Sequence, residues 1–157
     1  MDIRELMEAF GRDFGIEGFA ADADEIYTLC IDGMNVSFAE IAGGRLATWA
    51  EVCETQPEGR EHLYRMLLEA MFMGSGTSGA SFSIERGTDR IHLHRLDALA
   101  SLDVQSFKGM LEKFVNVLEE WRKLVADFRP VFGEIEKGEA AQRDARREMN
   151  EGGFIQV

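Results

Sequence analysis

Two histidines on one predicted strand are the residues best suited to hold a metal ion. His92 and His94 alternate along residues 91–96, and alternate residues of a strand project from the same face, so both imidazoles could reach one ion. Leu93 between them is predicted to point into the core, which leaves the pair on the solvent side. A zinc site needs further ligands, and no cluster of Cys, His or Asp at suitable spacing supplies them. We therefore expect no metal site.

A glycine-rich segment over residues 74–79, Gly-Ser-Gly-Thr-Ser-Gly, is the second candidate for chemistry. Phosphate-binding loops of similar composition follow a strand, open a helix and carry a lysine. This segment instead follows a predicted helix, precedes a predicted strand and contains no lysine. It is predicted to be a mobile connector.

Nucleophilic catalysis requires a Ser or Cys with an aligned base and an orienting acid. Cys30 and Cys53 lie inside apolar, alternating stretches, where a free thiol usually behaves as a small buried hydrophobe. Acidic pairs are abundant, but in so acidic a chain their proximity carries little information. We expect no catalytic residue, no cofactor and no enzymatic activity.

The acidic composition argues against nucleic acid as a partner. The 157 residues include 29 acidic and 17 basic side chains, for a net charge of −12, and a net −11 lies within residues 1–128. Nucleic-acid affinity comes largely from Lys and Arg contacts with phosphates, and anionic membranes repel such a surface for the same reason. No run approaches the ~18 apolar residues of a membrane span, and the first residues lack the pattern of a signal peptide. We expect a cytoplasmic protein with a polypeptide partner, although the charge also serves solubility alone.

Apolar periodicity divides residues 1–128 into eight elements. Helical spacing marks residues 3–14, about 60–73 and 103–128, and alternation marks strands at 25–31, 34–40, 46–53, 80–85 and 91–96. Asp32-Gly33 suits a type I′ hairpin turn, which needs positive φ at both central residues. The predicted fold is α+β, in the order α-β-β-β-α-β-β-α, with an antiparallel sheet flanked by helices. Residues 1–128 should form one domain, and residues 129–157 a charged tail that is partly helical or disordered.

The second predicted helix is apolar around most of its circumference. Its apolar positions are Leu63, Met66, Leu67, Ala70 and Met71 on one stripe, with Tyr64, Leu68 and Phe72 beside it. In a small domain the sheet covers only one side of a helix, so the other side needs a further partner. A second subunit would provide that partner, which predicts a homodimer. Burial of the helix inside one protomer would fit the same pattern.

Several local sequences carry a resemblance to a known family. They are Phe10-Gly11, Phe14-Gly15, residues 29–33 (LCIDG), residues 64–70 (YRMLLEA), residues 102–107 (LDVQSF), residues 111–114 (LEKF) and residues 119–121 (EEW). In this order, and in a small acidic chain, they resemble the class I type III secretion chaperones, the Tir chaperone (CesT-like) family, over residues 1–128. None of these sequences is a catalytic motif. The tail after Pro130 extends beyond the family core.

The resemblance implies a homodimer that binds the N-terminal segment of a secreted effector in extended form and keeps it competent for export, with secretion-apparatus components as further partners. It implies client contacts at Leu6, Met7, Phe10, Phe14, Ile26, Thr28 and Phe38. It implies a dimer contact at Leu63, Tyr64, Leu67, Leu68, Met71, Phe72 and Phe82. The alternatives are a structural or regulatory protein-binding module of the same fold unrelated to secretion, and a small-ligand-binding α+β domain.

Overall fold

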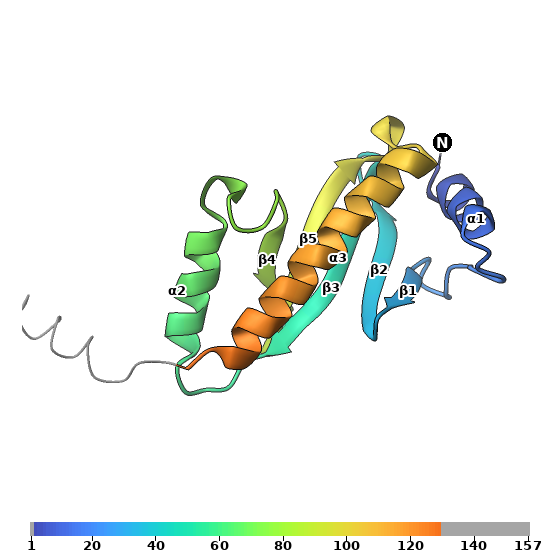
Figure 1. Cartoon of the computed structure of the whole chain (residues 1–157). Helices are drawn as coiled ribbons and strands as arrows, with labels where there is room; N and C mark the ends of the chain where they lie inside the picture. The colour runs from blue at the N-terminus through green and yellow to red at the C-terminus, as the bar shows by residue number, and fades with distance from the viewer. Residues whose placement is uncertain (1, 130–157) are drawn as a thin grey trace, which may run out of the picture.

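A computed structural model describes residues 2–129 and contains the predicted helices and strands in the predicted order (Figure 1). The elements are α1 (Ile3–Asp13), β1 (Tyr27–Ile31), β2 (Met34–Ile41), β3 (Arg45–Glu54), α2 (Arg60–Ala70), β4 (Ser81–Ile84), β5 (Arg90–Ala98) and α3 (Val104–Asp127). Short 3₁₀ turns follow α2 and β5. The predicted α+β order with an antiparallel sheet is confirmed. The predicted tail, apart from Arg129, lies outside the described residues.

The five strands form one antiparallel sheet in the order β1-β2-β3-β5-β4. The β1–β2 turn has φ values of 49° at Asp32 and 77° at Gly33, the positive values that a type I′ turn requires. The helix α2 and the short edge strand β4 come between β3 and β5 in the chain. β5 then returns to pair with β3, so β1 and β4 become the two edges of the sheet.

The hydrophobic core lies between one face of the sheet and the helices α1 and α3. The buried residues of β2 and β3 alternate, as one face of a strand requires; they are Met34, Val36, Phe38, Leu46, Thr48, Ala50 and Val52. α3 runs along this face (Figure 1). Its Phe107 ring lies 5.4 Å from the Phe38 ring and 5.0 Å from the Phe10 ring of α1. Because burying each such side chain contributes about 1.5–3 kcal/mol, these three rings join α1, the sheet and α3 into one unit.

Capping boxes begin both α1 and α3. The Asp2 carboxylate accepts a hydrogen bond from the Glu5 amide at 2.8 Å, and the Glu5 carboxylate accepts one from the Asp2 amide at 3.1 Å. Asp103 and Ser106 make the corresponding pair at α3. The Ser106 amide, which donates to Asp103, lowers the pKa of that carboxyl below its ordinary value. The first amides of a helix have no acceptor within the helix, and these side chains provide one. This explains why the two helices begin at these residues.

Two predictions were wrong: that Cys30 is buried, and that residues 74–79 form a mobile connector; Cys53 does pack against the core. Cys30 is exposed, because its place in the β1 alternation puts it on the side of the sheet away from α3. Cys53 is half-buried, and burial raises the pKa of its thiol. The glycine-rich segment 74–79 is anchored rather than a mobile connector: Thr77 is buried, and the Trp121 indole donates a hydrogen bond to the Gly76 carbonyl at 2.8 Å.

Candidate functional site

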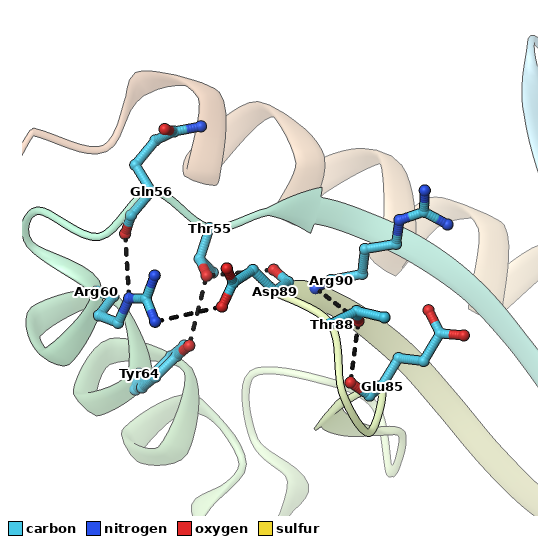
Figure 2. A network of polar contacts seen from close by, with 8 residues as sticks. All are labelled: Thr55, Gln56, Arg60, Tyr64, Glu85, Thr88, Asp89 and Arg90. Carbon is cyan, nitrogen blue, oxygen red and sulfur yellow. Dashed lines mark hydrogen bonds and ion pairs between the residues drawn. The ribbon is translucent and has the colours of Figure 1, made fainter.

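A polar network holds the N-terminal end of α2 to the sheet (Figure 2). The Thr55 amide donates to the Asp89 carbonyl at 2.8 Å, and the Thr55 hydroxyl lies 3.4 Å from the Tyr64 hydroxyl. The Arg60 guanidinium lies 3.2 Å from the Asp89 carboxylate and donates to the Gln56 carbonyl at 3.4 Å. These contacts join the start of α2 to the end of β3 and to the turn between β4 and β5. They place the helix at the β4 edge of the sheet.

The C-terminal end of α2 is held by side-chain and backbone contacts. The Met71 sulfur accepts a hydrogen bond from the Phe82 amide of β4 at 3.0 Å, and the Phe82 ring lies 5.0 Å from the Trp121 ring of α3. The Gly76 amide donates to the Ala70 carbonyl at 3.0 Å. A Cβ at Gly76 would lie 2.9 Å from that oxygen, so only glycine fits there without a shift. Fixed at both ends, α2 presents one side to solvent.

We call this surface the α2 face; it consists of Glu61, Tyr64, Arg65, Leu68, Glu69 and Phe72. Leu68 is 63% exposed and Phe72 is 75% exposed. Beside them a groove of about 240 Å³ lies between α2 and β4, lined mainly by apolar side chains. Two large exposed apolar side chains, rimmed by charged residues and beside an apolar groove, are typical of a protein interaction site.

The predicted dimer residues divide into three groups by exposure. Leu63 and Leu67 are buried in the protomer's own core, Tyr64, Met71 and Phe82 are half-buried beside the groove, and Leu68 and Phe72 are exposed on the α2 face. One stripe of the helix therefore packs within the protomer, and the adjoining stripe stays available. That these residues form a dimer contact stays a prediction.

The predicted client contacts divide in a similar way. Leu6, Met7, Phe10 and Phe38 are buried in the core, whereas Phe14, Ile26 and Thr28 reach the surface. Phe14 is 45% exposed; its ring lies 4.5 Å from that of Phe10, and the Lys108 ammonium lies 5.1 Å from its centre. A hollow of about 440 Å³ lies between α1 and residues 15–20. Periodicity could not separate the two groups, because an apolar stripe has the same spacing whether it meets a client or its own sheet.

The side of the sheet opposite α3 is a second exposed surface. We call it the outer sheet face, and it includes Thr28, Ser37, Ala47, Trp49, His94 and Leu96. Trp49, at the centre of this face, is half-buried and pairs with Ser37 on β2 and His94 on β5. A hollow of about 280 Å³ opens beside it. Trp49 was not among the predicted contact residues. The sequence did indicate its side of the sheet: Trp49 lies between Thr48 and Ala50, which face the core, so its side chain must project from the opposite face.

The two histidines lie on the outer sheet face, as predicted, while Leu93 is fully buried. His94 Nδ1 lies 3.1 Å from the Ser83 hydroxyl, and His92 Nε2 lies 3.5 Å from the Glu85 carboxylate. Burial, and secondarily His92, lowers the pKa of His94. Within residues 2–129, no group of three or more His, Cys, Asp or Glu is placed to hold a metal ion. None of the helices described is long and apolar enough to cross a membrane.

Comparison with known proteins gives one family. The model of the Tir chaperone protein (CesT) family matches residues 5–122. A chain of the ExsC–ExsE complex is 21% identical with a TM-score of 0.65, and the match covers 79% of this chain and 96% of that chain. A chain of the HopA1–SchA chaperone–effector complex is 15% identical with a TM-score of 0.63, covering 76% and 92%. The Yersinia pestis type III secretion chaperone SycH, solved with a stable fragment of YscM2, is 18% identical with a TM-score of 0.57, covering 74% and 97%. No curated protein matches.

Proposed function

Because the chain belongs to the Tir chaperone protein (CesT) family, we propose that it is a type III secretion chaperone that binds the N-terminal segment of an effector protein in extended form before export. The family match carries this proposal, since residues 5–122 include all five strands and most of each helix. The similar HopA1–SchA structure is a chaperone–effector complex. Residues 1–128 would form the chaperone domain and residues 129–157 an appended segment.

The surfaces of the molecule support binding of an extended polypeptide. β1 and β4 are edge strands, so a client segment could add its backbone beside either one. Near the β1 edge, the α1 hollow offers the apolar Ile16 and Phe19 together with the charged Glu8, Arg12 and Glu17. The outer sheet face offers the uncharged Thr28 and Ser37 there. Ordering a disordered segment costs conformational entropy, so its binding needs a large contact area. Such binding requires neither ATP nor a catalytic group, and we propose a non-enzymatic, cytoplasmic protein.

Exposure narrows the proposed client contacts. We propose that Phe14, Ile26 and Thr28 touch the effector directly, since their side chains reach the surface. The other four predicted contacts, Leu6, Met7, Phe10 and Phe38, are buried. Their proposed part is to hold α1 against the sheet, so that the surface around Phe14 keeps its shape.

We propose that the α2 face forms a homodimer contact. A twofold dimer brings the same patch of both subunits together, so the patch must complement itself. The exposed Leu68 and Phe72 would supply apolar contact. Glu61, Arg65 and Glu69 around them carry both signs of charge, which permits opposite charges to meet across the axis.

Co-expression with candidate secreted proteins tests the proposed function. The effector should copurify with the chain, and limited proteolysis of the complex should leave its N-terminal segment intact although that segment is cut rapidly alone. Phe14→Asp should lower the amount of copurified effector at least tenfold. Leu124→Asp is the matched control, because Leu124 is a similarly exposed apolar residue on α3. An effector segment cut equally fast with and without the chain would refute chaperone function.

A further inference from the structure

The turn that ends α2 holds a methionine in an unfavourable backbone conformation. Met73 has φ 57° and ψ 17°, in the left-handed region, where a side chain crowds the backbone and where glycine or asparagine usually ends a helix. Within residues 2–129, the other non-glycine residues with positive φ are Glu25, Asp32 and Ser78. All three are polar, so Met73 is the one apolar residue of this group.

Contacts within the protomer do not explain the choice of methionine. Met73 is 87% exposed, the most exposed of the large apolar side chains in residues 2–129. It adjoins Phe72 and Leu68, the exposed apolar residues of the α2 face. A residue that breaks a local backbone preference without a compensating contact usually serves a function. Met73 therefore extends the apolar part of the α2 face beyond the end of the helix.

The same surface contains a groove that can receive such a side chain. The groove between α2 and β4 shares Tyr64 and Leu68 with the α2 face. β4 runs in the opposite direction to α2: its first residues lie beside Met71, and the turn that follows Ile84 lies beside Arg60 at the start of the helix (Figure 2). The Tyr64–Ile84 part of the groove therefore lies toward the start of α2, whereas Met73 projects beyond its end.

We propose that Met73 inserts into the groove between α2 and β4 of a second copy of this chain. The inference rests on the proposed dimer and adds a specific contact to it. A twofold axis that crosses α2 near Leu68 places the two α2 helices antiparallel, so each Met73 meets the Tyr64–Ile84 part of the other groove. Because the projection and the groove belong to one surface, the contact closes on itself as a dimer.

An extended effector segment is the less suitable occupant of this surface. Such a segment gains affinity by adding its backbone to a free strand edge and its side chains to pockets. It would use the groove but would give no reason to hold Met73 in an unfavourable conformation. A second copy uses the projection and the groove at the same time.

Two substitutions at Met73 separate the side chain from the backbone strain. Met73→Ala shortens the side chain but keeps a Cβ, whereas Met73→Gly removes both. Each should raise the dissociation constant of the dimer about tenfold or more in sedimentation equilibrium, because both copies lose a buried methionine. In the Leu68→Glu background, which should be monomeric, only Met73→Gly should raise the urea midpoint, since relief of the positive φ outweighs the greater freedom of glycine in the unfolded chain.

Ser78→Gly is the matched control for strain. Ser78 has φ 51° in the same loop and is exposed, so its replacement by glycine should raise the urea midpoint and leave the dissociation constant unchanged. Ile84→Ala tests the groove, because Ile84 lines it and is 49% exposed. If Met73 meets the groove, the effects of Met73→Ala and Ile84→Ala on dimerisation should be less than additive.

Three results would overturn the inference. Normal dimerisation of Met73→Ala, or effects strictly additive with those of Ile84→Ala, would remove Met73 from the groove and leave the Leu68 contact standing. A monomeric unaltered chain would refute the α2 contact as well. A Met73→Ala variant that dimerises normally but no longer copurifies with an effector would assign this surface to the client. Sedimentation and urea titration contain no effector, so their results do not depend on whether the chain acts as a chaperone.

Discussion

Leu68→Glu should separate the subunits of the proposed dimer without unfolding the protomer. Leu68 is 63% exposed on the α2 face, and replacing an exposed residue away from special features usually changes stability by no more than about 0.5 kcal/mol. Leucine and glutamate also have similar helix propensities. The protomer should therefore keep its urea midpoint.

The effect on association can be worked out from this exposure. Fully burying a leucine side chain is worth about 1.5–3 kcal/mol, so covering the exposed part of Leu68 contributes about 1–2 kcal/mol per copy. A twofold interface contains the residue twice, which gives about 2–4 kcal/mol and a dissociation constant about 30- to 900-fold higher. Burying the new carboxylate adds a further cost, so these values are lower bounds.

Sedimentation equilibrium over a wide concentration range measures this change. Leu124→Glu, which alters an exposed leucine on α3, should leave the dissociation constant within about twofold of the unaltered chain. Leu68 is a better probe than Met71, whose sulfur accepts the Phe82 amide and is part of the protomer's own structure. An unaltered chain that stays monomeric, or a Leu68→Glu variant that dimerises normally, would refute the α2 contact.

Three further predictions follow from single residues. Phe10→Asp should destabilise the domain by several kcal/mol rather than remove client binding alone, because it puts a carboxylate at a 3%-exposed core position; an unchanged urea midpoint would contradict this. Trp121→Phe should lower the free energy of unfolding by about 1 kcal/mol through loss of the hydrogen bond to Gly76, and unaltered thermal unfolding would show that this bond is not needed. Burial lowers the pKa of His94 in the folded state. At pH values between this lowered pKa and the ordinary pKa of histidine, the unfolded chain therefore binds more protons than the folded chain. Stability should therefore fall as pH drops through about 6.5, and His94→Gln should reduce this loss in urea titrations at pH 7.5 and 5.5; an identical pH dependence in the variant would exclude His94 as a source.

Local signals explain why the element order was predictable. The strand alternation, the helical spacing and the positive-φ turn at Asp32-Gly33 all depend on residues close in sequence, and the structure reproduces each of them. The third helix, predicted at residues 103–128, is observed at Val104–Asp127. A pattern that repeats every two or 3.6 residues also states which residues share a face.

What periodicity leaves open is the neighbour that each face meets. Phe10 and Phe14 belong to one apolar stripe, yet Phe10 packs on Phe107 while Phe14 reaches solvent. Segment 74–79 looks flexible by composition, but the distant Trp121 anchors it.

The sequence by itself determined the elements, their order, the acidic charge and the family resemblance. Only the tertiary structure decided which apolar side chains close the core and which form the α2 face and the outer sheet face. The physical reason is that burial is a property of two surfaces in contact. One of the two comes from a part of the chain far away in sequence, as when α3 covers one side of the sheet and leaves Trp49 on the other.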